Sequence, residues 1–160
     1  MPKVNKTTDK DLGAIRIIQE AKTANTSFVE IGVFEEAGEH TSSDGLLTVA
    51  EVAFFNEFGT LNAPERSFIR STIDDNRREL EQLTAKLFRQ IVEGKTDTKK
   101  ALDKLGFKIQ TLIQQRILKL NDPANAPSTI EAKGFNNPLV DSRELHRSIA
   151  FETVIKKGVG

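Results

Sequence analysis

Apolar side chains recur at helical spacing along two long stretches of the chain. One stretch runs from Arg66 to Glu93 and is followed by Gly94, and the other runs from Asp97, a good helix cap, to Leu120. Their apolar positions are Ile69, Ile73, Leu80, Leu83, Leu87 and Ile91, then Leu102, Leu105, Ile109, Leu112, Ile113, Ile117 and Leu120. The short connection between them predicts an antiparallel helical hairpin over about 66–120, with coiled-coil dimerisation as the alternative.

Alternating apolar and polar positions predict strands at Phe28–Phe34 and Ile149–Ile155, which we expect to pair with each other. The polar, turn-rich segment 35–45 is expected to be a loop. Together with the hairpin, these strands predict an α+β fold with one domain over 9–160. In this fold a small antiparallel sheet packs against the long helical hairpin and several short helices.

Short helices are indicated by two capping boxes, in which a side chain at the start of a helix and a Glu three residues later satisfy each other's backbone donors. Thr48 and Glu51 form the first box, and the helix that they open is expected to end at Phe58 with Gly59 as a left-handed terminator. Pro64 then suits a turn or the entry to the next helix. Residues 141–144, Asp-Ser-Arg-Glu, form the second box and predict a helix through about Ser148.

The remaining segments carry weaker signals. Residues 1–8 are expected to be a flexible tail, followed by a helix through about Ala24 that Asp9 or Asp11 can cap. That helix has Leu12, Ile15 and Ile18 on one side. Residues 121–140 are rich in Pro, Gly and Asn and are expected to be irregular, with room for a short helix that begins at Pro127.

Charge is distributed unevenly, although the net charge of the chain is zero. The segment 28–64 carries acidic residues and no Lys or Arg, whereas 95–120 is predominantly basic. Opposed patches on one molecule favour head-to-tail association of copies, although two unlike solvated surfaces would have the same pattern. The N-terminal residues have no apolar run and no segment is long and apolar enough to span a membrane, so neither a signal peptide nor a membrane contact is expected.

Catalytic equipment is not evident in the sequence. The absence of Cys excludes disulfides, thiolate metal sites and a Cys nucleophile, and neither His40 nor His146 has an obvious nucleophile nearby. His40–Glu51 places Gly and Glu as a calcium loop requires, but His40 occupies the first position, where a carboxylate is needed. We therefore expect no enzyme activity, no cofactor and no metal site.

Two surface features remain as candidates for binding. Lys100, Lys104 and Lys108 share one helical face that could contact nucleic acid, although an ordinary solvated face is the simpler interpretation, and we expect no aromatic residue to interleave with the lysines as a base-stacking platform would. The other feature is a turn flanked by Glu57 and Arg66, which could form an ion pair. Four phenylalanines lie in the same region of the sequence. These are Phe54, Phe55, Phe58 and Phe68, which either meet a partner or all enter the core.

The stretch AEVAFFNEFGT followed by APERSFIR resembles the "A..NEFGT…iP.R.F.R" signature of tailed-bacteriophage head–tail connector proteins, which include neck and tail-completion (virion-morphogenesis) proteins. The later stretch STIEAKGFNNPLVDSRELHRSIAFE resembles their second block, "T…KG…PL.DTG.L..SI.y.v". Ser67 stands where the family usually has Pro, and Ser142-Arg143 stand where it has Thr-Gly. The positions that match are Asn56, Glu57, Phe58, Gly59, Thr60, Pro64, Arg66, Phe68 and Arg70, then Pro138, Leu139, Asp141, Leu145 and Ile149.

This resemblance implies a role as well as an α+β fold. It implies a structural protein that forms a homo-oligomeric ring in the virion neck, with the matching residues at its contacts. Its partners would be other copies of itself, portal, adaptor or head-closure proteins, and tail-tube or terminator proteins, with non-specific contact to packaged DNA. The protein would reside in the host cytoplasm during assembly and then in the virion. The alternatives are a tail terminator ring or, less favoured, a DNA-contacting regulatory protein that uses the lysine face.

Overall fold

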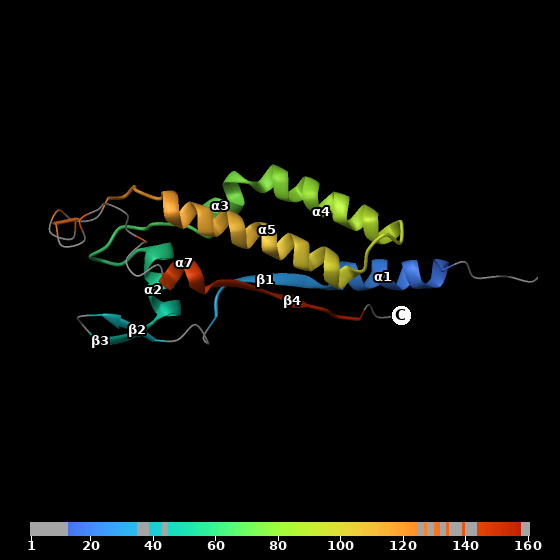
Figure 1. Cartoon of the computed structure of the whole chain (residues 1–160), viewed down its shortest axis with the longest axis horizontal. Coiled ribbons are helices and arrows are strands. Elements are labelled where there is room, and N and C mark those ends of the chain that lie inside the picture. The colour runs from blue at the N-terminus through green and yellow to red at the C-terminus, as the bar shows by residue number, and fades with distance from the viewer. Residues whose placement is uncertain are drawn as a thin grey trace, which may run out of the picture.

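Helix α5 (Thr98–Lys119) lies across a sheet made of β1 (Phe28–Val33) and β4 (Ile149–Val154), as Figure 1 shows. The computed structural model describes residues 13–34, 39–42, 45–124, 127, 130, 131, 134, 139 and 144–157. The two strands are antiparallel, with Phe28 opposite Val154 and Val33 opposite Ile149. The fold is α+β, and the pairing of these strands confirms the prediction.

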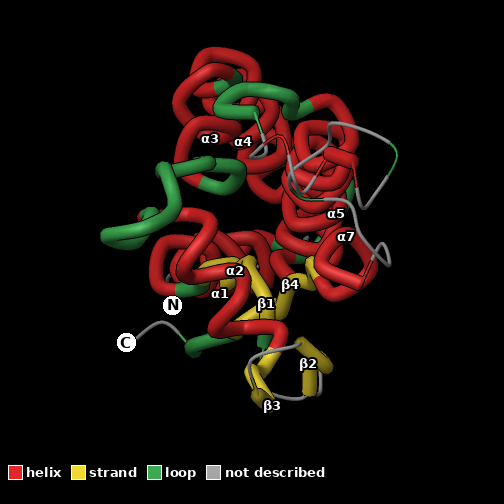
Figure 2. The backbone as a smooth tube through the Cα atoms, turned by 90° about the vertical axis from the view of Figure 1, so that its left-hand side faces the viewer, coloured by secondary structure: helices red, strands yellow, loops and turns green. Residues whose placement is uncertain are grey.

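The predicted helical hairpin is present and is formed by α4 (Arg77–Val92) and α5. Gly94 has a φ of 69° in the connection, and the Asp97 carboxylate accepts a hydrogen bond from Lys100 N at the start of α5. Leu87 and Ile91 of α4 pack with Ala101 of α5 in a small core. Because the apolar stripes pair within one chain, a coiled-coil dimer is not needed to bury them. Figure 2 shows α4 and α5 close together on one side of the sheet.

Helix α1 (Ala14–Thr26) is shorter at its start than predicted and begins after Gly13. Asp9, Asp11 and Leu12 lie outside the described residues. Ile15 and Ile18 are more than half exposed, so the predicted stripe does not face the core. Instead, Ala24 packs against the α4–α5 core, and the Glu20 carboxylate accepts hydrogen bonds from Thr98 N (2.9 Å) and Thr98 Oγ1 (2.8 Å). Glu20 therefore joins α1 to the first turn of α5.

The single helix predicted from Arg66 is wrong in two respects. The helical region begins at α3 (Arg70–Asp75), and it is interrupted at Asn76 before α4 begins. Residues 66–69 do not join the helix because a buried carboxylate, described below, binds the backbone N–H groups of 68–70. At the interruption, Asn76 N and Asn76 Nδ2 both donate to Thr72 O, which closes the turn locally.

The loop predicted at 35–45 is also partly wrong. The described residues within it belong to a hairpin of β2 (Glu39–Ser42) and β3 (Gly45–Thr48), in which Ser42 is opposite Gly45. Turn-forming residues suit the tight turn of a hairpin as well as they suit a loop, so composition could not separate the two. The hairpin lies beside α2 (Val49–Phe58), beyond the end of the β1–β4 sheet (Figure 1).

The capping box at the start of α2 is confirmed. Thr48 N donates to Glu51 Oε2 (2.8 Å), and Glu51 N donates to Thr48 Oγ1 (3.1 Å). The hydrogen bonds that the Glu51 carboxylate accepts from Thr48 N and Thr48 Oγ1 lower the pKa of Glu51 from its ordinary value. The helix ends at Phe58, as predicted, and Gly59 follows with φ 73° and ψ 175°. The positive φ was predicted, but this ψ is extended and not left-handed helical.

The main core lies where α2, α5, α7 (Glu144–Ser148) and β4 meet. Gln110 Nε2 of α5 donates to Ile149 O (2.6 Å), and Gln114 Nε2 donates to His146 O (3.2 Å), which fixes α7 and β4 against α5. The buried residues of this core are Val49, Ala53, Phe68, Ile113, Ile117, Leu139, Leu145 and Ile149. Pro127 is helical, in line with a short helix there, whereas the proposed cap Asp141 lies outside the described residues.

Candidate functional site

The side chain of Glu57, a residue of α2, anchors the turn that joins α2 to α3. Its side chain is buried, with 5% of the residue exposed. Glu57 Oε2 accepts from Phe68 N (2.8 Å) and Ile69 N (2.9 Å), while Oε1 accepts from Arg70 N (2.9 Å) and Ser67 Oγ (2.8 Å). These backbone N–H groups lie at the start of α3, where Ile69 is the N-cap and no partner exists within the helix. The carboxylate of α2 therefore caps α3 from a distance, and the positive end of the α3 dipole favours its charge.

The predicted ion pair between Glu57 and Arg66 is wrong. Since four donors already occupy the Glu57 oxygens, Arg66 turns to other acceptors. Arg66 Nε donates to Pro123 O (3.1 Å) and Arg66 Nη2 donates to Ala124 O (3.2 Å). Partial burial lowers the pKa of Arg66 below its ordinary value. Arg66 thus ties the turn to the segment that follows α5.

The intervening residues hold a fixed backbone path. Arg66 N donates to Asn56 O (2.7 Å), and Thr60 N donates to Ala63 O (2.8 Å). Thr60 Oγ1 accepts from Ala63 N (3.0 Å), a local turn typical of Thr. Two features require glycine at position 59: its φ is positive, and an added Cβ would lie 2.8 Å from Glu65 N. Pro64 is exposed within this turn.

An aromatic patch, Phe54, Phe55 and Phe58, lies on α2 next to this turn. The three residues are 58%, 39% and 54% exposed, whereas Phe68 is fully buried. The rings contact one another, with centroids 4.8 Å apart for Phe54 and Phe58 and 6.1 Å apart for Phe54 and Phe55. The Arg70 guanidinium lies 5.5 Å from the Phe58 centroid and pairs with Glu65. The four phenylalanines therefore do not all enter the core: one is buried there and three lie at the surface.

The residues that match the connector signature thus differ in exposure, and Asn56, Gly59 and Arg66 are half-buried. Glu57, Phe68, Leu139 and Leu145 are buried, so they can shape a contact surface only from inside. Phe58, Thr60, Pro64 and Arg70 are exposed and available for direct contact. Pro138 and Asp141 lie outside the described residues. Nothing in the sequence signalled that Glu57 binds backbone donors of the next helix, because such an acceptor leaves no periodic pattern.

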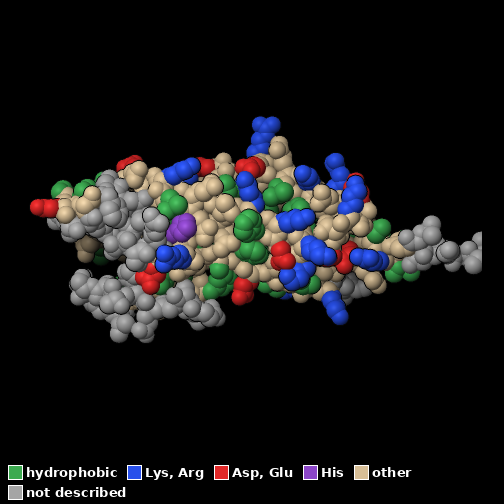
Figure 3. Space-filling model, in the orientation of Figure 1, with side chains coloured by type: hydrophobic (Ala, Val, Ile, Leu, Met, Phe, Trp, Pro, Cys, Tyr) green, Lys and Arg blue, Asp and Glu red, His purple; other side chains and the backbone are tan. Residues whose placement is uncertain are grey.

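The lysine face of α5 is largely engaged within the chain. Lys100 pairs with Asp97 (2.9 Å) and Lys108 pairs with Glu79 of α4 (2.7 Å), whereas Lys104 is exposed and forms no ion pair with a described residue. Phe107 is 66% exposed and lies three residues beyond Lys104, so an aromatic side chain does share this face. Helical spacing alone could have revealed it. Figure 3 shows acidic side chains between the basic ones over this region.

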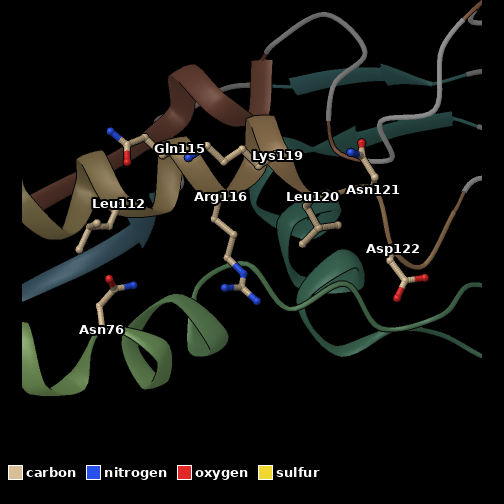
Figure 4. Close-up of a pocket in the computed structure, with 8 residues that line it drawn as sticks. All are labelled: Asn76, Leu112, Gln115, Arg116, Lys119, Leu120, Asn121 and Asp122. Carbon is tan, nitrogen blue, oxygen red and sulfur yellow. The ribbon is translucent and has the colours of Figure 1, made fainter.

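An open pocket of about 450 Å³ lies beside the C-terminal half of α5. Its polar groups do not converge: in Figure 4, Gln115 and Lys119 extend along one side of α5, whereas Arg116 extends from the other side. Arg116 Nη1 is engaged by Asp75 Oδ2 at 2.6 Å. Among the described residues, no three His, Asp or Glu side chains are placed to hold a metal ion. The arrangement of this pocket supports neither a nucleophile with its base nor a cation site.

In comparisons with known proteins, the chain matches no protein-family model, no curated protein sequence and no solved structure. Within the described part of the chain, no helix combines the length and the apolar character needed to cross a membrane.

Proposed function

We propose that this chain is a structural protein of the neck of a tailed bacteriophage, where it forms a homo-oligomeric ring that joins or completes the head–tail interface. The observation that carries this proposal is an exposed aromatic patch on α2, next to a turn whose backbone donors are bound by a buried carboxylate. Its partners are other copies, portal, adaptor or head-closure proteins, and tail-tube or terminator proteins. It acts without catalysis or a cofactor, first in the host cytoplasm and then in the virion.

The patch has the features of a protein-binding surface. Exposed aromatic residues and Arg are enriched at the energetic centres of interfaces, and a contiguous apolar patch on a surface usually marks such a contact. Phe54, Phe55 and Phe58 supply the aromatic rings, and Arg70 lies over Phe58. Because Glu57 holds the turn before the partner arrives, little ordering is required on binding, which favours affinity. The resemblance to connector sequences includes Glu57, Phe58 and Arg70, whereas Phe54 and Phe55 stand at variable positions of the signature; the shared residues support a contact within the virion.

Two other roles have less support. A tail terminator ring would use the same patch at the end of the tail tube and differs only in position. A DNA-contacting role is disfavoured because Asp97 and Glu79 pair with Lys100 and Lys108, two of the three lysines that would meet phosphate. Tight binding to random duplex DNA that weakens steeply with salt would favour that role.

Head–tail joining in extracts tests the proposal. Particles assembled without this chain should yield filled heads and separate tails, and added purified protein should restore joining. The Phe54→Ala/Phe58→Ala variant should lower the yield about tenfold or more, because buried aromatic anchors typically contribute at least 1–2 kcal/mol each.

Phe88→Ala is the matched control, because Phe88 is an exposed phenylalanine on α4 away from the patch. It should join heads and tails as the unchanged protein does. Circular dichroism must show that both variants are folded. Joining in the absence of the chain, or equal loss in the two variants, would contradict the proposal.

A further inference from the structure

The β1–β4 sheet has one covered and one open face. Ile149 is fully buried, the Phe151 ring lies against Gly106 of α5, and Thr153 Oγ1 donates to Asp103 Oδ1 (2.8 Å). Because side chains alternate along a strand, these residues and their partners in β1 face α5. The opposite face carries three cross-strand pairs, which are Phe28 with Val154, Glu30 with Glu152, and Gly32 with Ala150.

The centre of the open face is negatively charged. Glu30 and Glu152 are direct partners in the register, and both are exposed. Like charges directly opposite each other destabilise a strand pair. The nearby Lys156 ammonium lies over the Phe28 ring, 4.9 Å from its centroid, at the end of the sheet. An external cation that approached the middle of this face would relieve the repulsion.

A complementary surface is present on α5. Lys104 and Phe107 lie on one side of the helix, and both are exposed. At about 100° per residue, this side is roughly a quarter turn away from the side that carries Asp103, Gly106 and Gln110 and faces the sheet. The molecule therefore presents an acidic face with a small-residue pair. At an angle to it lies a second face with the exposed Phe107 ring and with Lys104, a cation that pairs with no described carboxylate.

The two surfaces also correspond in position along the molecule. Three contacts set the alignment of α5 on its own sheet: Asp103 with Thr153, Gly106 with Phe151, and Gln110 with Ile149. Along the direction of the α5 axis, Glu152 therefore lies at about the same position as Lys104, and Ala150 lies at about the same position as Phe107. A rotation about an axis parallel to α5 does not change the position of a residue along that axis. It can bring Lys104 of one copy to Glu30 and Glu152 of the next, and Phe107 to the Gly32–Ala150 pair.

We propose that copies of this chain associate head to tail through these surfaces, with α5 of one copy on the open sheet face of the next. This inference rests on the proposed function and identifies the contact by which the ring forms. Each sheet would then lie between two helices, as α/β layers commonly do. Because the two surfaces are at an angle and not on opposite sides of the molecule, successive copies turn and close a ring.

Charge reversal with rescue tests this contact by sedimentation velocity over a concentration series. The unchanged protein should associate, and Lys104→Glu should lower the association constant about tenfold or more, since like charges would then meet. Glu30→Lys/Glu152→Lys should do the same while keeping a like-charged pair within the sheet. The triple variant, with all three changes, restores opposite charges across the contact and should associate again.

Lys86→Glu is the matched control, because Lys86 is exposed on α4 and the change in charge is identical. It should associate as the unchanged protein does. Association of Lys104→Glu at the unchanged level, no recovery in a folded triple variant, or an unchanged protein that stays monomeric throughout would overturn the contact. The head–tail joining assay distinguishes this contact from the proposed function. If a monomeric chain joined heads and tails, only the contact would be contradicted. If the chain associated but did not join them, only the neck function would be contradicted.

Discussion

Replacing Glu57 by Gln tests the turn at the scale of one residue. The amide keeps the shape but loses the charge, and its NH2 group faces backbone donors that need an acceptor. Leaving buried N–H groups unsatisfied costs about 1–3 kcal/mol, so the free energy of unfolding in urea should fall by about that amount. Glu81→Gln, at an exposed position on α4, should change it by less than about 0.5 kcal/mol. Similar effects at the two positions would show that Glu57 is not the anchor described here.

Gly106 tests the packing between two elements. An added Cβ would lie 2.3 Å from the Phe151 ring, so α5 could no longer rest as closely on β4. Ala is favoured over Gly inside a helix by about 1 kcal/mol, but overpacking typically costs about 1–3 kcal/mol. Gly106→Ala should therefore lower the thermal midpoint. The loss should be smaller in the Phe151→Leu background, where the ring is absent, and an equal loss in both backgrounds would rule out this clash.

The dependence of stability on pH belongs to the whole molecule, because several carboxylates contribute. Hydrogen bonds from Lys99 and Thr153 lower the pKa of Asp103 from 3.8, and those from Lys100 lower the pKa of Asp97. A lowered pKa in the folded state adds stability above the unfolded value, and that stability is lost as pH falls through the folded value. The free energy of unfolding should therefore drop at acidic pH, and Asp103→Asn should make the drop shallower. An identical acid profile for Asp103→Asn would exclude this contribution.

Local signals were sufficient for most elements. The capping box at Thr48, the cap at Asp97 and the glycine at 94 each depend on neighbouring residues, so they could be predicted and were confirmed. At Gly59 the helix end and the positive φ were confirmed, but the left-handed helical conformation was not. The predicted helix from Arg66 failed because helical periodicity in the sequence does not reveal a carboxylate from another element. Glu57 binds the N–H groups of 68–70, so the helix begins only at Arg70 and residues 66–69 stay outside it.

The sequence by itself determined most of the helical and extended segments and where most of them end, because caps, glycines and periodic apolar positions act over a few residues. It also placed the aromatic residues and the charges along the chain. Only the tertiary structure decided which phenylalanines are exposed, which lysines are already paired, and that Glu30 lies opposite Glu152. These properties depend on contacts between residues far apart in the chain, which form only when the packed helices and the sheet bring them together.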